Sequence, residues 1–480
     1  MADFSLDHFI DGAFHPSLSG RRFDDPEPAR GRVLASVARG AADDVDRAVQ
    51  AAQEAGRGWA LTPVAERSRW LSRIADGIEA RFEEFAAAEA RDTGKPLSLC
   101  RAVDIPRAVA NFRFFAGAVL HDELGCHPME GALNYTLRRP VGVFGLISPW
   151  NLPIYLLSWK VAPALATGNT VVCKPSEVTP LSAGLLADVV REIGLPPGVF
   201  NLVHGFGPEA GQRLVEHPDV PGISFTGGTA TGKIVGATAS AQFKKLSLEL
   251  GGKNASIVFA DCDLEATIEG VARAGFANQG QICLCGSRVL VERPLLERFT
   301  EGLAAWARAR VIGDPLDPAT TFGSLVSLAH RDKVEGYVAL AKEEGGRIVA
   351  GGRRPEDPAL GEGAFFEPTV VADLPPGCRT ATEEIFGPVI TVHPFDTEEE
   401  AVALANAVRY GLAGSVWTQN LGRAHRVAAN VESGMIWVNC WLLRDLRVPF
   451  GGMKDSGVGR EGGRHSLDFY SELRNVCVKL

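Results

Sequence analysis

Two residues with reactive side chains, Cys283 and Glu249, stand in distinctive motifs. Cys283 ends a run that is rich in small and amide-bearing residues, Phe276–Ile282, and lies shortly before an apolar strand, Val289–Val291. Small neighbours let a ligand come close to a thiol, so Cys283 is a candidate nucleophile. A lone cysteine is more often a buried apolar residue. The nucleophile is favoured here because other motifs accompany it, among them Glu-Leu-Gly-Gly-Lys, which Glu249 opens.

A thiol and a carboxylate of this kind could act together on an electrophilic carbonyl carbon. Attack by the Cys283 thiolate would make the carbon tetrahedral and leave negative charge on its oxygen, where one preorganised donor is typically worth ~3–4 kcal/mol. Glu249 could then serve as the general base that activates water. Glu249 could also be a structural carboxylate at a strand end. Gly251 and Gly252 favour the catalytic role, because they allow another backbone or a cofactor to approach closely.

Composition limits the possible functions of the 480-residue chain. Hydrophobic residues make up 46% and charged residues 22%, which is ordinary for a globular protein. The net charge of −9 argues against binding to a nucleic-acid backbone. The nine cysteines form neither a CxxC pair nor a cluster with histidine, so we expect no metal site and no disulfide framework. The sequence shows neither a signal peptide nor an apolar run of about 18 residues, so we expect a cytoplasmic protein without membrane contact.

Strands that alternate with helices are predicted over most of the chain from residue 141 onward. The first is a continuous apolar strand over Val141–Ile147, and a later helix covers Leu181–Ile193. Such alternation predicts an α/β fold with a doubly wound parallel sheet, followed by a second α/β unit from residue 252 to about residue 450. The other elements predicted for the first unit are strands over Thr170–Cys173, Val199–Val203, Gly222–Phe225 and Lys245–Leu250 and a helix over Trp159–Ala166.

The two ends of the chain have other patterns. Thr62 is interpreted as the N-cap of one long helix whose apolar face reaches Phe85, and Thr-Gly-Lys-Pro at 93–96 ends this helix. Residues 121–139 alternate and contain glycine and proline, which predicts a hairpin-like excursion. The last residues, 475–480, form an alternating strand that would be a poor free edge and is better paired with another subunit.

Two glycine-rich turns could hold the phosphates of a dinucleotide. Gly205–Ala210 fits G-x-G-x-x-A after a predicted strand, but no acidic residue lies near the expected offset of about twenty residues, and the pattern alone is weak. The second turn, Phe225–Gly232, follows the next strand and opens a helix. Free N–H groups at a helix N-terminus suit a pyrophosphate, so this second turn is the favoured phosphate site.

Four stretches in this order resemble the NAD(P)-dependent aldehyde dehydrogenase superfamily, and the similarity runs over nearly the whole chain. They are Pro149–Asn151, Glu249–Lys253, the run ending at Cys283, and Glu383–Pro388. The resemblance implies three domains and an assembly as a homodimer or homotetramer. The implied domains are an NAD-binding domain over 1–120 and 141–251, a catalytic domain over 252–450, and a small β oligomerisation domain over 121–140 and 465–480.

The resemblance also implies a role for each site residue. Cys283 is the nucleophile, Glu249 is the base, and Asn151 donates to the oxyanion together with the backbone N–H of Cys283. Lys160 and Glu461 match positions that help to relay protons around the base. The implied cofactor is NAD. The residues implied to contact it are Ile147, Ser148, Pro149, Trp150, Lys174, Ser176, Glu177, Gly207, Phe225, Thr226, Gly227, Gly228, Leu250, Gly251, Glu384 and Phe386.

Positions 177 and 228 bear on the preference for NAD and on phosphate binding. A carboxylate at Glu177 repels a 2′-phosphate and so favours NAD over NADP, although Lys174 and Glu177 could also be a solvated pair on a loop. Gly228 stands where many relatives have serine, so a hydroxyl contact to phosphate is missing and backbone N–H groups are left to bind it.

A narrower resemblance concerns the substrate. Arg444-Asp445-Leu446, Asp104–Arg107 and Pro149–Pro153 resemble the 2-aminomuconate and 2-hydroxymuconate semialdehyde dehydrogenases, which oxidise an aldehyde that carries a carboxylate at its far end. A guanidinium group suits a carboxylate. We therefore predict Arg444, with Arg101 as a second contact and Phe450 beside them, as substrate-binding residues. Alternatively, Arg444 could pair with Asp445 or Asp468 on the surface.

Other functions remain open at this stage. A broader dehydrogenase for betaine aldehyde or aliphatic aldehydes could use Trp441 and Tyr155 as aromatic walls, but an arginine would repel a quaternary ammonium. A coenzyme-A-acylating enzyme usually lacks the base at Glu249, and a non-catalytic relative is expected to have lost Cys283 or Glu249. Ester hydrolysis is treated as a side activity. The choice between an amino and a hydroxyl substrate, the pathway (tryptophan degradation or aromatic catabolism), and the role of Cys285 are not decided.

Overall fold

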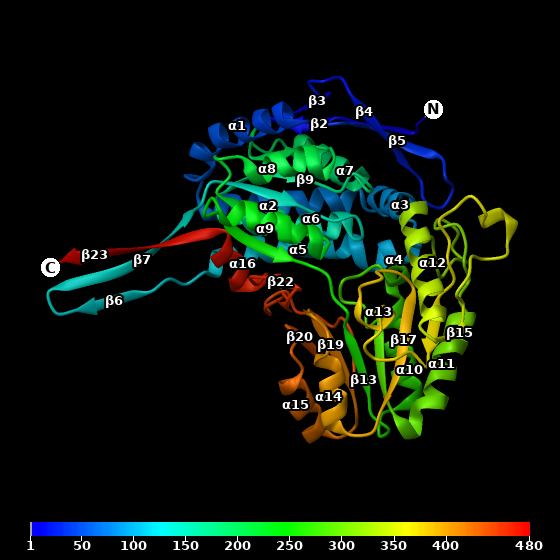
Figure 1. The fold of residues 1–480 in the computed structure, drawn as a ribbon. Helices are drawn as coiled ribbons and strands as arrows, with labels where there is room; N and C mark the ends of the chain where they lie inside the picture. The colour runs from blue at the N-terminus through cyan, green and yellow to red at the C-terminus, as the bar shows by residue number, and fades with distance from the viewer. Residues whose placement is uncertain (1) are drawn as a thin grey trace.

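Two large sheets, one above the other in Figure 1, form the body of the molecule. The computed structural model describes residues 2–480. The upper sheet has eight strands, and its central five, from β12 to β10, are parallel. In spatial order its strands are β22 (Gly457–Val458), β12 (Lys245–Glu249), β11 (Gly222–Thr226), β8 (Val143–Ile147), β9 (Thr170–Lys174), β10 (Phe200–Leu202), β2 (His8–Ile10) and β3 (Ala13–His15).

The lower sheet has seven strands and is parallel except for β15. In spatial order its strands are β15 (Arg347–Ala350), β16 (Thr369–Ala372), β17 (Val389–Phe395), β14 (Arg288–Glu292), β13 (Ala255–Val258), β19 (Ala413–Trp417) and β20 (Met435–Val438). Smaller sheets contain β1 (Phe4–Leu6), β5 (Val33–Ala38) and β4 (Arg22–Pro26), and β18 (Tyr410–Gly411) with β21 (Met453–Lys454).

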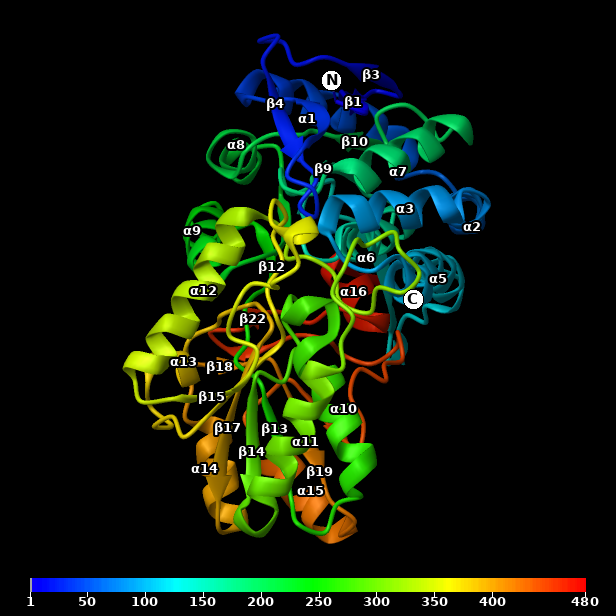
Figure 2. The same ribbon diagram turned by 90° about the vertical axis from the view of Figure 1, so that its right-hand side faces the viewer.

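Helices flank both sheets, as the turned view in Figure 2 shows. Those of the upper half are α1 (Ala42–Trp59), α2 (Val64–Ala80), α3 (Phe82–Thr93), α4 (Leu97–Leu99), α5 (Ile105–Ala118), α6 (Pro153–Ala166), α7 (Leu181–Glu192), α8 (Gln212–Glu216), α9 (Thr229–Ser240) and α16 (Gly463–Phe469). Those of the lower half are α10 (Leu264–Phe276), α11 (Leu296–Arg308), α12 (Leu328–Glu343), α13 (Arg379–Thr382), α14 (Glu398–Asn406) and α15 (Leu421–Asn430). The predicted alternation of strand and helix is confirmed.

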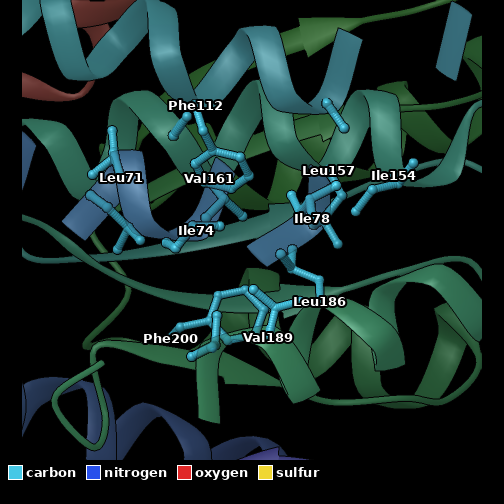
Figure 3. Packing of buried hydrophobic residues seen from close by; sticks show 14 of the residues in the cluster. Leu71, Ile74, Ile78, Phe112, Ile154, Leu157, Val161, Leu186, Val189 and Phe200 are labelled. Atoms are coloured by element: carbon cyan, nitrogen blue, oxygen red, sulfur yellow. The ribbon is translucent and has the colours of Figure 1, made fainter. Parts of the chain in front are cut away.

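The core of the upper half is built around α6, every residue of which is buried. Figure 3 shows Leu157 and Val161 of this helix packed with side chains of α2, α5 and α7. A fully buried aliphatic side chain contributes about 1.5–3 kcal/mol, so α6 is held firmly in place. Pro153 begins the helix directly after Leu152, and the preceding loop with Asn151 is therefore anchored by the core.

The predicted long helix from Thr62 is wrong in two details. It is broken into α2 and α3 at Arg81, whose backbone angles are φ −108° and ψ 26°. Leu71, Ile78 and Phe85 keep the same apolar period on both sides of the break, so hydrophobic spacing gives no sign of it. Thr62 does not cap α2 either: its hydroxyl donates to the carbonyl of Gly58, and Pro63 precedes the helix.

A three-stranded arm extends away from the body, with the C-terminus at its tip (Figure 1). It contains β6 (Cys126–Met129), β7 (Ala132–Pro140) and β23 (Ser471–Lys479). The predicted hairpin is confirmed, and β23 pairs with β7 over its whole length, from Ser471 opposite Pro140 to Lys479 opposite Ala132. One partner of the C-terminal strand is thus β7 of the same chain, which agrees with a single small domain over 121–140 and 465–480. Pairing of β23 with another subunit through its other edge stays a prediction. Within residues 2–480, no helix has both the length and the apolar character needed to cross a membrane.

Candidate active site

Four parallel strands of the upper sheet end side by side at one edge. Their last residues are Ile147 of β8, Lys174 of β9, Thr226 of β11 and Glu249 of β12. Ile147 is in register with Lys174, and Thr226 with Glu249. The carboxyl ends of parallel strands are where α/β sheets bind ligands, so the predicted cofactor residues and the predicted base belong to one edge.

The lower half of the molecule brings the predicted nucleophile to this edge. Cys283 follows a tight turn in which Asn278 and Gln279 have left-handed backbones, with φ 52° and 55°. This turn directs the loop after α10 across the carboxyl end of the upper sheet. Glu384 lies on another loop of the lower half, and its Oε1 accepts the N–H of Gly252 at 2.8 Å. A Cβ at Gly251 would collide with the Glu384 carboxylate, so glycine is required for this approach.

A cavity of about 250 Å³ lies between the two halves and contains all three predicted catalytic residues. It also contains many of the predicted cofactor contacts. Its lining consists of Pro149, Trp150, Asn151, Leu156, Thr226, Gly227, Gly228, Glu249, Leu250, Gly251, Cys283, His330, Lys333, Glu384 and Phe386. The remaining predicted cofactor residues, Ile147, Ser148, Lys174, Ser176, Glu177, Gly207 and Phe225, do not line this cavity.

Burial dominates the electrostatics of the two reactive groups. It raises the pKa of the Cys283 thiol, the carboxylates of Glu249 and Glu384 raise it further, and the guanidinium of Arg444 opposes them. Burial also raises the pKa of Glu249, followed by the nearby Glu461. Neither carboxylate oxygen of Glu249 has a hydrogen-bond partner among residues 2–480. A buried carboxyl group whose pKa is raised is suited to take up a proton, as a general base must.

A buried ion pair lies next to Glu249. The Nζ of Lys160 is 3.2 Å from Oε1 of Glu461 and donates to Oγ of Ser224 at 2.8 Å. The structure thus brings together the two residues predicted to relay protons: the carboxylate of Glu461 raises the pKa of Glu249, and the ammonium of Lys160 lowers it.

The predicted phosphate turn has room for a ligand. Gly228 precedes α9 in an extended conformation, and a Cβ at this position would meet no atom within 4 Å. Further along the edge, Nζ of Lys174 is 2.8 Å from Oε2 of Glu177. A Cβ at Gly211, the residue after the first glycine-rich turn, would lie 3.9 Å from the side chain of Lys174. The helical segment that begins at Gly207 therefore ends against the side chain of Lys174.

Three aromatic rings frame the cavity near Glu384. Trp150 and Phe386 meet edge to face, with centroids 5.2 Å apart and planes at 87°, and His330 lies 5.1 Å from Trp150. Burial lowers the pKa of His330 to about 4, so the ring is neutral at pH 7, and its Nε2 is 2.7 Å from the carbonyl oxygen of Phe386. Sequence reasoning missed His330 and Lys333, because both lie early in α12, where no motif marks them.

Arg444 lies close enough for its charge to act on Cys283, and its guanidinium contacts two aromatic rings. Its guanidinium carbon is 4.0 Å from the centroid of Phe450 and 4.6 Å from that of Trp159. Nε and Nη2 are buried and have no hydrogen-bond partner among the residues described. The alternative of a surface ion pair is contradicted, because Asp445 pairs with Arg447, and Asp468 with Arg138 and Arg464.

The prediction for Arg101 needs correction. Its guanidinium is exposed and pairs with Glu83 at 2.6 Å, because Arg101 lies on the outer face of the turn that precedes α5. Arg107 is the arginine of this segment that faces the site: it lies 5.4 Å from the Tyr155 ring, and its charge lowers the pKa of Arg444. Val103, one helical turn earlier, packs against the apolar wall around Cys283. Residues four positions apart share one face of a helix, so the spacing between Val103 and Arg107 could have identified Arg107.

Cys285, whose role the sequence left undecided, is a buried neighbour of the nucleophile. Burial raises the pKa of its thiol to about 12. Its Sγ is 3.8 Å from the carbonyl oxygen of Ala277. Unlike Cys283, Cys285 does not line the cavity and is packed in the apolar cluster beside it, so we interpret Cys285 as part of the apolar wall.

Comparisons with known proteins agree with this arrangement. The sequence model of the Aldehyde dehydrogenase family matches residues 14–476. A 2-hydroxymuconic semialdehyde dehydrogenase from Pseudomonas sp. (strain CF600) is 54% identical, and the alignment covers 99% of both chains. A 2-aminomuconic semialdehyde dehydrogenase from Danio rerio is 49% identical over 99% of this chain and 98% of its own. The NAD+ complex of an aldehyde dehydrogenase from Bacillus cereus is 41% identical, with a TM-score of 0.97 over 99% of this chain and 97% of that one.

Proposed function

The chain belongs to the aldehyde dehydrogenase family, and we propose that it oxidises a carboxylate-bearing semialdehyde to the dicarboxylic acid with NAD. The substrate class is that of 2-hydroxymuconate or 2-aminomuconate 6-semialdehyde, for which relatives at 54% and 49% identity are named. The observation that carries the substrate proposal is Arg444: its buried Nε and Nη2 atoms have no hydrogen-bond partner among residues 2–480, and its charge acts on the Cys283 thiol.

The proposed reaction starts at the thiol. Cys283, once deprotonated, attacks the aldehyde carbon, and the resulting oxyanion is stabilised by the side-chain amide of Asn151 and the backbone N–H of Cys283. Oxidation of this thiohemiacetal leaves a thioester on Cys283. Glu249 then removes a proton from water as the water attacks the thioester, and Glu461 and Lys160 carry the proton onward. The product acid leaves and the thiol is restored.

The residues at the sheet edge fit a dinucleotide. Glycines at 227 and 228 and the start of α9 suit the pyrophosphate, and the carboxylate of Glu177 suits ribose hydroxyls. Glu384, held by the N–H of Gly252, and Phe386 would hold the nicotinamide end near Cys283. When bound there, NAD+ supplies the hydride acceptor.

Arg444 and Arg107 favour a carboxylate-bearing semialdehyde over betaine aldehyde as the substrate. The guanidinium of Arg444 acts on Cys283, and that of Arg107 lies near Arg444 and Tyr155. Both suit a carboxylate, whereas they would repel the quaternary ammonium of betaine aldehyde. Of the two aromatic walls considered for such a cation, Tyr155 has the guanidinium of Arg107 5.4 Å from its ring, and the indole N–H of Trp441 donates to the carbonyl of Leu284. Two further rings, Trp159 and Phe450, are covered by the guanidinium of Arg444. The acid semialdehyde is therefore the better substrate.

The proposed domain roles follow the two sheets. Residues 1–120 and 141–251 supply most of the upper sheet and the dinucleotide edge, and residues 252–450 supply the lower sheet and Cys283. The arm, over 121–140 and 465–480, is proposed to join subunits in a homodimer or homotetramer, because β23 leaves one edge unpaired by any strand among the residues described. All nine cysteines are free, which fits the reducing cytoplasm.

The test is NADH formation by the purified protein with 2-hydroxymuconate 6-semialdehyde and betaine aldehyde in parallel assays. We expect NADH from the semialdehyde and little from betaine aldehyde, and no NADH from the Cys283→Ala variant. Preference for betaine aldehyde would contradict the substrate class while keeping the dehydrogenase. Equal rates for Cys283→Ala and the parent protein would contradict the mechanism.

A further inference from the structure

We propose that Lys95 is a positioning residue for the oxyanion donor: it holds the backbone of Asn151 from a buried ionic cluster behind the active site. This inference rests on the proposed role of Asn151. Lys95 lies between α3 and α4, in the Thr-Gly-Lys-Pro stretch that the sequence marked only as the end of a helix.

Lys95 is completely buried and makes contacts with three oxygen atoms. Its Nζ donates to the carbonyl of Asn151 at 3.2 Å, and it lies 3.2 Å from Oδ1 of Asp104 and 3.5 Å from Oε2 of Glu89. Both carboxylates are also completely buried. Burial alone would lower the pKa of Lys95, but Asp104 and Glu89 more than offset it and raise the pKa, so Lys95 is charged at neutral pH.

Glu89 fixes the other end of the same loop. Its Oε1 accepts the N–H of Ile154 in the first turn of α6 at 2.8 Å, where a carboxylate also interacts favourably with the helix dipole. The backbone is thus held at Asn151 by Lys95 and three residues later at Ile154 by Glu89, and the two side chains pair with each other. This closed arrangement restricts the backbone from which the Asn151 amide projects.

The Asn151 carbonyl also connects to the loop of the nucleophile. Nδ2 of Asn278 donates to this carbonyl at 3.0 Å and to the carbonyl of Gln281 at 3.2 Å. The side-chain amide of Asn151 donates to the same Gln281 carbonyl at 2.8 Å. Because Gln281 lies close before Cys283 in the chain, the position of the amide relative to the thiol depends on the atoms that hold the Asn151 backbone.

An ion pair with no part in catalysis would stabilise the fold without affecting the oxyanion. A double variant distinguishes a fold-stabilising role of Lys95 from a positioning role. If Lys95 acts through Asn151, the loss of turnover in the double variant is smaller than the product of the two single losses. A displacement of a reacting group by about 1 Å can cost about 100-fold in rate. We therefore expect Lys95→Met to lower the turnover of a folded enzyme by about 10- to 100-fold.

The experiment compares Lys95→Met, Asn151→Ala and the double variant. The readouts are hydrolysis of p-nitrophenyl acetate, which needs the thiol and the oxyanion donor but no cofactor, and the dissociation constant of NAD+. Because Lys95→Met leaves two buried carboxylates unpaired, Lys95→Met/Asp104→Asn is tested in parallel. The cluster has one ammonium and two carboxylates before this exchange and one carboxylate after it, so its net charge is unchanged.

Lys244→Met is the matched control. Lys244 is also buried, and its Nζ donates to two backbone carbonyls, those of Val215 and His217, outside the active-site cavity. We expect Lys244→Met to lower thermal stability but to keep a hydrolysis rate within about twofold of that of the parent protein. This change is smaller than the loss expected for Lys95→Met.

The proposal is supported if Lys95→Met, or its charge-balanced form, lowers turnover while the dissociation constant of NAD+ is unchanged. In addition, Lys95→Met should lower the turnover of the Asn151→Ala variant by less than about a further twofold. It is overturned if the folded variants keep full turnover or if the two effects multiply. If Asn151→Ala itself has no effect, the proposed oxyanion role fails, and the inference about Lys95 fails with it.

Discussion

Replacing Arg444 by methionine tests the substrate assignment most sharply. Methionine keeps a flexible apolar side chain that can fill the space between Trp159 and Phe450, where sulfur packs well against rings. The exchange removes the charge and the buried donors at Nε and Nη2, which have no other partner among residues 2–480. It therefore removes carboxylate binding with little change in packing.

The expected magnitude follows from the donors. A hydrogen bond that involves a charged group contributes roughly 1.5–3 kcal/mol. Because both donors belong to one guanidinium and share its charge, we take the lower part of this range for each, and the loss of two then amounts to about 3–4 kcal/mol. Each 1.4 kcal/mol corresponds to a factor of about ten. We therefore expect kcat/KM for a carboxylated semialdehyde to fall by about 10²–10³, mainly through a higher KM, while a neutral aldehyde of similar length changes by less than about fivefold.

The assay measures kcat and KM for both aldehydes with the parent protein and Arg444→Met. Arg101→Met is the matched control, because its guanidinium is exposed and pairs with Glu83 at the surface. We expect this control to behave like the parent protein with either substrate. If Arg444→Met lost the same factor on the neutral and the carboxylated aldehyde, the carboxylate-binding role of Arg444 would be refuted.

Three other predictions concern the cofactor and the base. Glu177→Gln should raise kcat/KM for NADP+ by about tenfold, since a carboxylate no longer repels the 2′-phosphate; an unchanged NADP+ rate would contradict this. Gly228→Ser has space for its side chain and adds a hydroxyl at the start of α9, so the Kd of NAD+ should fall by up to about fivefold in calorimetry; weaker binding would refute it. Burial and then Glu461 raise the pKa of Glu249, which acts deprotonated. Glu461→Gln removes one of these causes, so the rising limb of the kcat–pH profile should move to lower pH, and a move to higher pH would oppose the assignment.

Residues that belong to contiguous motifs could be predicted from the sequence. The glycines beside Glu249 leave space for Glu384 and for the backbone of Cys283, and Gly280 before Cys283 has a positive φ of 70°. Both needs fall on consecutive residues, so they leave a pattern in the chain itself. The structure indeed brings Asn151, Glu249 and Cys283 to one cavity. The parallel core of the upper sheet was also predictable, because strands and helices alternate along the sequence.

Site residues were harder to identify where their role depends on which face of a helix points toward the site. Arg101 and Arg107 are six positions apart, and only the packing of Val103 and the buried Asp104 shows which side of the segment faces inward. From the sequence, Lys95 was interpreted only as part of the stretch that ends a helix. Its role could not be predicted, because its partners come from three separate segments of the chain. The antiparallel edge strands β2, β3 and β22 are too short to leave a periodic signal, and they join the sheet from distant parts of the chain.

The most direct test of the account is a single-turnover measurement with Glu249→Gln, NAD+ and 2-hydroxymuconate 6-semialdehyde. Without the base, oxidation should proceed and hydrolysis should stop. We predict a rapid burst of one NADH per active site, and mass spectrometry should find the acyl group on the peptide that contains Cys283. Steady NADH production at the parent rate, or a burst with no adduct on Cys283, would contradict the covalent mechanism.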